Sequence, residues 1–191
     1  LSAKVTSVGT DCVNYEIGGE AKTVKADCVL VSIGRRPSTA GLGLENIGVL
    51  TERGAIVTND KLETNVAGVW AAGDVNGRSM LAHTAYREGE VCINNILGKK
   101  DRINYNSIPA VIYTNPEVAS VGETTETAKE KGLDVNIQTL TLKYSGRYIA
   151  ENEHGYGILK VITDKKHKNI VGLHMIGSYA SEIIYGAAMM V

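Results

Sequence analysis

The feature that most constrains the fold is a wholly apolar stretch, residues 68–72 (GVWAA), that stops at Gly73 and Asp74. A continuous apolar run predicts a strand that is buried on both faces of its sheet. Beyond a polar loop, apolar residues recur at helical spacing, and Gly98 is well placed to end that helix. The recurring positions are Leu81, Ala82, Ala85, Cys92, Ile93 and Ile96. Together these segments predict a strand, a polar turn and a helix, the repeating unit of an α/β fold.

Asp74 lies at the carboxyl end of this predicted strand, where ligands of open α/β sheets bind. Its carboxylate suits sugar or polyol hydroxyls because it only accepts hydrogen bonds, and Gly73 lets a ligand approach the backbone closely. The next helix points its N-terminal N–H groups, from about Met80 to His83, at the same crevice and would stabilise negative charge there. The pattern also allows a structural role, in which Asp74 caps a turn and residues 80–82 only pack.

The first 33 residues predict a short β-meander around the turn Gly18-Gly19, which leads into residues 28–33 (CVLVSI) as a buried central strand. Residues 34–37 (GRRP) interrupt this strand and predict a domain crossing. Residues 55–57 predict a further strand. Residues 41–46 (GLGLEN) follow no strand and have Asn where a dinucleotide fingerprint needs its third Gly, so they predict a loop.

The second half of the chain, from about Tyr105, has the pattern of a strand-rich domain. A helix is predicted over residues 124–131, with Thr124 and Gly132 as its caps, and residues 164–169 predict a solvated hairpin loop. An apolar helical run closes the chain. These elements predict an antiparallel sheet with helices on one face, an α+β domain. The predicted strands cover residues 110–113, 118–121, 135–142, 157–163 and 170–176.

Charge and metal-ligating residues exclude several classes of function. Twenty basic and 21 acidic residues give a net charge of −1, which argues against a nucleic-acid or anionic-membrane partner. The three cysteines have no paired spacing, so they predict reduced, partly buried thiols and neither a disulfide framework nor a zinc site. The four histidines likewise show no metal-like spacing. These residues are Cys12, Cys28, Cys92, His83, His154, His167 and His174.

Tyr144, Arg147 and Tyr148 form a basic-aromatic group that could bind an anion, although an arginine packed on tyrosine is the commoner arrangement. Both ends of the chain lack the signals of a natural terminus, and we expect a longer parent on both sides. The start has no signal-peptide layout, and no apolar run approaches the roughly 20 residues that span a bilayer. We expect a bacterial cytoplasmic protein, with the mitochondrial matrix as the alternative.

Four motifs stand in a fixed order along nearly the whole chain, at residues 33–37 (IGRRP), 71–75 (AAGDV), 80–83 (MLAH) and 113–122 (YTNPEVASVG). In this order and spacing they resemble the pyridine nucleotide-disulfide oxidoreductases, flavoproteins with two dinucleotide-binding domains. The Gly-Asp element is typical of the wide family. Residues 80–85 (MLAHTA) resemble the dihydrolipoyl dehydrogenases within it.

The resemblance implies roles for six residues. Asp74 would be the partner of the FAD ribityl chain, and Gly34 would lie at the nicotinamide dinucleotide. Met80, Leu81, Ala82 and His83 would form the helix N-terminus that lies against the isoalloxazine ring. His83 therefore matches a flavin-contacting motif and not a catalytic base.

The resemblance also implies a domain plan of mixed α/β and α+β class. Residues 1–33 would end the NAD-binding domain, and residues 34–103 would be the C-terminal part of the FAD-binding domain. Residues 104–191 would be most of an α+β dimerisation domain with an antiparallel sheet. The family's Gly-rich FAD and NAD fingerprints, its redox-active cysteine pair and its catalytic His with a Glu partner match no residues of this chain.

The expected function of the parent is oxidation of protein-bound dihydrolipoyl groups with FAD and NAD. The expected partners are a second copy, through residues 104–191, and the lipoyl domains of 2-oxo acid dehydrogenase complexes or the glycine cleavage protein. The chain alone should be inactive and should bind FAD weakly or not at all. The alternatives are a cofactor-free dimerising interaction module and another flavin reductase, of the mercuric or coenzyme A disulfide type.

Overall fold

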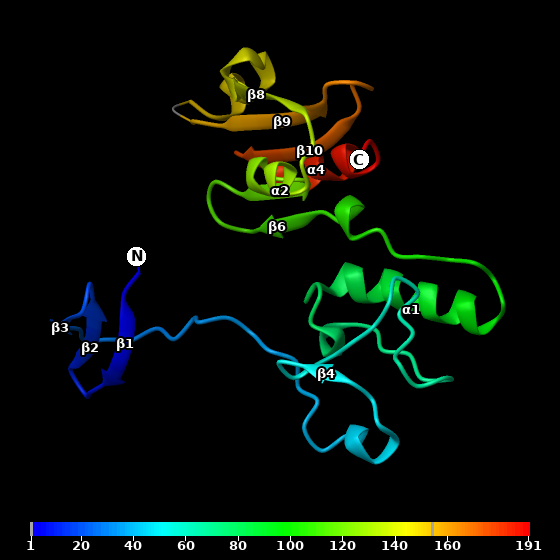
Figure 1. Ribbon diagram of the computed structural model, residues 1–191. Coiled ribbons are helices and arrows are strands. Elements are labelled where there is room, and N and C mark those ends of the chain that lie inside the picture. The colour runs from blue at the N-terminus through cyan, green and yellow to red at the C-terminus, as the bar shows by residue number, and fades with distance from the viewer. Residues whose placement is uncertain (1, 154) are drawn as a thin grey trace. The chain divides into compact units, whose positions relative to one another are not determined.

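The computed structural model describes residues 2–153 and 155–191, and the chain divides into two units, residues 1–35 and 36–191 (Figure 1). His154 lies outside the described residues. The first unit is a three-stranded antiparallel sheet of β1 (Lys4–Val8), β2 (Cys12–Ile17) and β3 (Glu20–Lys25) in that order. Gly18 and Gly19, with φ of 60° and 83°, turn β2 back into β3. The predicted meander is confirmed.

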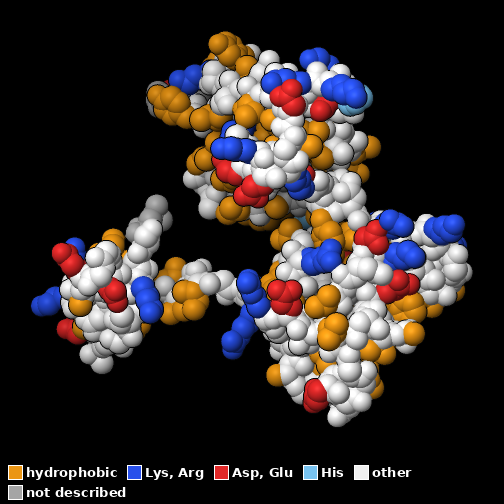
Figure 2. All heavy atoms as spheres, in the orientation of Figure 1, with side chains coloured by type: hydrophobic (Ala, Val, Ile, Leu, Met, Phe, Trp, Pro, Cys, Tyr) orange, Lys and Arg blue, Asp and Glu red, His pale blue; other side chains and the backbone are white. Residues whose placement is uncertain are grey.

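Residues 28–33 do not form the predicted central strand. They have no strand partner among the described residues, and the side chains of Leu30 and Ile33 are 89% and 93% exposed. The space-filling view shows a group of hydrophobic side chains on this segment (Figure 2). A strand needs a neighbour to pair its N–H and C=O groups, and β1 to β3 pair only with one another. The prediction from apolar content was therefore wrong.

The second unit begins with short elements around two small cores. A 3-10 helix, η1 (Leu44–Ile47), precedes the hairpin of β4 (Thr51–Glu52) and β5 (Ala55–Ile56), and a second 3-10 helix is η2 (Asp74–Asn76). Residues 68–72 are not the predicted strand, because Trp70 makes only an isolated bridge to Glu63. Ala71 is nevertheless buried. The two cores contain Val49, Ile56 and Ala71 in one, and Leu62, Val91, Cys92 and Ile103 in the other.

The helix predicted after Gly73 is α1 (Ala82–Ile96). Gly98 follows it with φ of 77°, and its N–H donates to the Asn95 carbonyl, so the predicted end of the helix is confirmed. The buried face differs from the predicted apolar stripe, because Ile93 and Ile96 are more than half exposed. The buried residues of α1 are instead Thr84, Glu88, Val91 and Cys92.

The C-terminal half of this unit contains the predicted antiparallel sheet, of five strands in the order β6-β7-β10-β9-β8. All five predicted strands are confirmed. They are β6 (Ala110–Ile112), β7 (Val118–Gly122), β8 (Val135–Thr141), β9 (Ile158–Asp164) and β10 (Ile170–Ile176). The other elements are η3 (Tyr105–Ser107), α2 (Thr125–Glu130), η4 (Leu142–Tyr144), α3 (Gly146–Glu151) and α4 (Ala180–Ala188).

Helices α2 and α4 contact opposite faces of this sheet. Leu173 and Met175 of β10 belong to the core that Ile184 of α4 completes. His174 lies between them on the other face, and its ring hydrogen-bonds the carbonyl of Glu123 just before α2, at 2.9 Å. The prediction of helices on one face was wrong, because sequence periodicity shows which positions are buried but not which helix covers them.

The described residues contain neither a membrane-spanning helix nor a cluster of metal-ligating side chains. None of the described helices is long and apolar enough to cross a membrane. No group of three or more His, Cys, Asp or Glu side chains in residues 2–153 and 155–191 is arranged to hold a metal ion. The three cysteines are unpaired, and Cys92 alone of them is buried.

Candidate functional site

The turn at Gly73 and Asp74 is held against helix α1. Gly73 has φ of 83° and ψ of −161°, a conformation that residues with a side chain rarely adopt. Its N–H donates to Oε2 of Glu88 at 2.5 Å, and a Cβ at this position would lie 3.5 Å from that of Ala85. The backbone that leads into Asp74 is thus fixed on the first two turns of α1. The Asp74 side chain itself is exposed.

Some backbone N–H groups at the N-terminus of α1 have no hydrogen-bond acceptor within the helix. Its N-cap residue, Leu81, makes no side-chain hydrogen bond to the first turn, and the first turn has no acidic residue. The first N–H that bonds within the helix is that of Ala85, to the Leu81 carbonyl at 3.0 Å. The N–H groups of residues 82–84 can therefore meet an external acceptor or a negatively charged group. The helix begins two residues later than the predicted amide tip at Met80.

His83 is occupied by a structural contact. Its Nε2 lies 2.7 Å from the carbonyl oxygen of Pro109, and because a carbonyl only accepts, the proton is on Nε2. The ring thus ties the start of α1 to the residue before β6. The interpretation that His83 is no catalytic base stays a prediction.

A buried carboxylate that the sequence analysis missed lies beneath the turn. Glu88 is fully buried, and its Oε1 accepts a hydrogen bond from the Tyr105 hydroxyl at 2.7 Å. Burial, together with this hydrogen bond and the nearby carboxylate charge, raises the pKa of Tyr105. The Arg78 guanidinium lies 5.5 Å from the centre of the Tyr105 ring. The only signal in the sequence is that Glu88 stands at helical spacing from Thr84, Val91 and Cys92.

The structure therefore places five of the six predicted site residues in one continuous region. Asp74, Met80, Leu81, Ala82 and His83 lie in η2, in the loop after it and at the start of α1. The sixth, Gly34, lies in the first unit, exposed and with φ of 103°. Its predicted role at the nicotinamide dinucleotide stays a prediction, as do the domain boundaries at residues 33/34 and 103/104.

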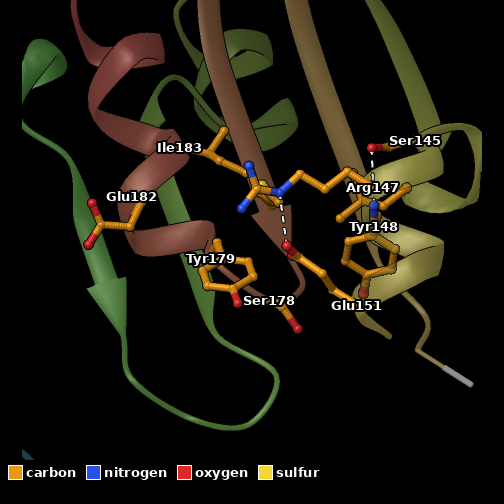
Figure 3. Close-up of a pocket in the computed structure, with 10 residues that line it drawn as sticks. Ser145, Arg147, Tyr148, Glu151, Ser178, Tyr179, Glu182 and Ile183 are labelled. Atoms are coloured by element: carbon orange, nitrogen blue, oxygen red, sulfur yellow. Dashed lines mark hydrogen bonds and ion pairs between the residues drawn. The ribbon is translucent and has the colours of Figure 1, made fainter. Parts of the chain in front are cut away.

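The basic-aromatic group forms no single anion site. Tyr148 is buried and Tyr144 is 84% exposed, while Arg147 is paired with Glu151 at 2.9 Å. Arg147 and Glu151 line an apolar cleft of about 470 Å³ between α3 and α4 (Figure 3). The other residues that line this cleft are Leu142, Ser145, Tyr148, Met175, Ser178, Tyr179, Glu182 and Ile183.

Comparison with protein families identifies the class to which this fold and site belong. The model of the pyridine nucleotide-disulphide oxidoreductases matches residues 1–89, and the model of that family's dimerisation domain matches residues 108–191. The chain therefore belongs to the pyridine nucleotide-disulphide oxidoreductase family, whose members bind FAD and NAD.

Within this family the chain is similar to dihydrolipoyl dehydrogenases. It is 40% identical to the mitochondrial dihydrolipoyl dehydrogenase of Pisum sativum, over 99% of this chain and 39% of the relative. It is 44% identical to the enzyme of Trypanosoma brucei brucei, over 96% of this chain and 39% of the relative. Leghemoglobin reductase of Glycine max is 40% identical, over 99% of this chain and 37% of the relative.

Solved structures show the same relationship. The crystal structure of LpdA from Mycobacterium tuberculosis superposes with a TM-score of 0.85 at 26% identity, over 99% of this chain and 42% of that chain. The Cu(II) complex of the flavoprotein disulfide reductase RclA from Escherichia coli gives 0.79 at 30% identity, over 98% and 44%. The chain thus spans about two fifths of the length of the proteins it matches.

Proposed function

We propose that residues 1–191 act as part of a dihydrolipoyl dehydrogenase, which oxidises protein-bound dihydrolipoyl groups with FAD and NAD. The observation that carries this proposal is the Gly73-Asp74 turn seated on the uncapped N-terminus of α1, in a chain about 40% identical to such enzymes over nearly its full length. An exposed carboxylate beside free backbone donors fits a ligand that has both hydroxyls and a group that gains negative charge.

In this proposal each residue has a limited task. Asp74 accepts a hydrogen bond from a ribityl hydroxyl, and the N–H groups of residues 82–84 stabilise negative charge on the flavin ring beside Met80 and Leu81. Gly34 gives the nicotinamide dinucleotide close access to the backbone. FAD, when bound, supplies the transfer of electrons from the dithiol to NAD. We further propose the bacterial cytoplasm, or the mitochondrial matrix, as the location of the whole protein.

The proposed partners are a second copy and lipoyl domains. The dimerisation-domain match supports self-association through residues 104–191. Lipoyl domains of 2-oxo acid dehydrogenase complexes, or the lipoyl protein of glycine cleavage, would bring the substrate to the whole enzyme.

The test is made on the whole protein that carries this chain. We expect it to be yellow with bound FAD and to reduce NAD when dihydrolipoamide is supplied. Replacing Asp74 by Asn should weaken FAD binding, whereas Asp134→Asn, at an exposed pair with Lys165, should leave it unchanged. A colourless protein would favour the interaction module. Reduction of mercuric ion or coenzyme A disulfide, without dihydrolipoamide activity, would favour another flavin reductase. The likeness to RclA, a flavoprotein disulfide reductase, also supports that general class.

A further inference from the structure

Glu88 joins three elements through one fully buried carboxylate. It projects from the second turn of α1, accepts the N–H of Gly73 on Oε2 and accepts the Tyr105 hydroxyl on Oε1. Gly73 immediately precedes Asp74, and Tyr105 begins η3. The side chain therefore connects the turn of the proposed flavin site to its helix and to the segment that leads into the sheet.

Packing alone does not explain a carboxylate here. Burying a carboxylate costs free energy unless it is hydrogen-bonded or paired, and an apolar side chain of similar size avoids that cost. None of the ion pairs among the described residues involves Glu88. What Glu88 provides, and a leucine would not, is an acceptor for the amide of Gly73 and for the Tyr105 hydroxyl.

The turn at Gly73 needs a contact that fixes its backbone, because a glycine residue alone leaves several backbone conformations open. Glycine populates several backbone regions, so a turn with φ of 83° keeps one direction only where a contact fixes it. The backbone orientation at Gly73 determines where the Asp74 side chain lies relative to the free N–H groups of α1.

We propose that Glu88 is a positioning residue of the flavin site, which holds the Gly73 amide and thereby aims Asp74 at the N-terminus of α1. The inference rests on the proposed function, because Asp74 is there the acceptor for the ribityl chain. Because Glu88 is fully buried, it has no surface to offer to FAD or substrate and would act only through the Gly73 amide.

The first test compares two substitutions in the whole protein. Glu88→Leu removes both acceptors at similar volume, and we expect the dissociation constant of FAD, measured by flavin fluorescence, to rise about tenfold or more. Glu88→Gln should stay within about twofold of the wild type, because its amide oxygen accepts the Gly73 N–H and its NH₂ group donates to the Tyr105 oxygen. In the FAD-free protein, deuterium uptake over residues 70–78 should rise in Glu88→Leu and not in Glu88→Gln.

A matched control separates positioning from stability. Glu123 is also a buried carboxylate, 5% exposed, and accepts hydrogen bonds from Asn106 and Lys131 in the C-terminal half of the unit. Glu123→Leu should lower the melting temperature and leave FAD affinity unchanged. If Glu88→Leu does not fold, Glu88→Asp replaces it, since a side chain one methylene shorter falls short of Gly73, and the same loss of affinity is expected.

A double-mutant cycle with Asp74→Asn completes the test. If Glu88 acts through Asp74, the effects of Glu88→Leu and Asp74→Asn on FAD affinity are less than additive. Additive effects, or a folded Glu88→Leu protein with wild-type affinity, would overturn the inference while leaving the flavin site standing. Unchanged affinity in Asp74→Asn would instead overturn the proposed flavin site.

Discussion

Gly172 and Gly186 lie in the same half of the chain, but Gly172 is closely packed and Gly186 has open space around it. A Cβ at Gly172 in β10 would come within 2.0 Å of the Glu123 carbonyl oxygen, whereas a Cβ at Gly186 in α4 would meet nothing within 4 Å. We expect Gly172→Ala to lower the free energy of unfolding by about 1–3 kcal/mol or more. Gly186→Ala should raise it by about 0.5–1 kcal/mol, because alanine favours a helix interior. Urea denaturation of both variants measures the two effects, and a shift of the same sign in both would contradict the packing at β10.

The contribution of Asp101 to stability is expected to depend on pH. Hydrogen bonds from Arg87 and Asn94 lower its pKa to about 2. Since the unfolded value is about 3.9, the stabilisation by ionised Asp101 is complete above about pH 4 and is lost as the pH falls towards 2. In Arg87→Ala the pKa should return towards its ordinary value. Carboxyl NMR titration of the two proteins shows this, and an unchanged pKa would mean that the arginine does not bind Asp101 in solution.

Near Gly73, the sequence pattern pointed to residues with a recognisable position and missed the buried Glu88, which accepts the N–H of Gly73. Asp74 could be found because it ends an apolar run, and α1 because its apolar residues recur. Glu88 could not be assigned, because a glutamate in a helix is ordinarily exposed, and its acceptor role depends on the fold that brings Gly73 and Tyr105 to it.

Helix α2 depends on its first turn, because it is only six residues long. The Thr124 hydroxyl accepts the N–H of Thr127, and the Thr127 hydroxyl accepts the N–H of Thr124. Thr124→Ala should lower the free energy of unfolding by about 1 kcal/mol. Glu130→Ala, at an exposed position near the other end, is the matched control and should change stability by less than about 0.5 kcal/mol. Thermal unfolding of both variants tests this, and equal melting temperatures would show that the cap adds nothing.

Elements were predictable where local pattern and pairing agree. Each strand of the five-stranded sheet has a hydrogen-bonded neighbour within the chain, and β6 and β7 also alternate in burial. Residues 28–33 and 68–72 have the composition of strands but no ladder partner, so composition alone misled the prediction. Helix α3 was missed because it is only six residues long and begins at Gly146, a poor helix former, and because Ser145, which caps the helix, resembles any loop serine.

The whole molecule is expected to self-associate through its C-terminal half. Ile183 is half exposed at the edge of the apolar cleft, and Tyr185, Met189 and Met190 are exposed farther along α4 and just beyond it. Ile183→Glu should weaken a dimer detected by sedimentation, because it buries a charge in the interface. Tyr86→Glu, at a more exposed position on α1, should leave the dimer intact. A clean monomer of the unaltered protein at high concentration would contradict this expectation.

The uncovered run at residues 29–33 affects how the protein can be handled. It has no charge and no proline, and Val29, Leu30, Val31 and Ile33 all face solvent. A segment with these properties pairs readily with its own copies from other molecules and so begins aggregation. When residues 1–191 are purified on their own, this segment is a reason to keep the solution dilute.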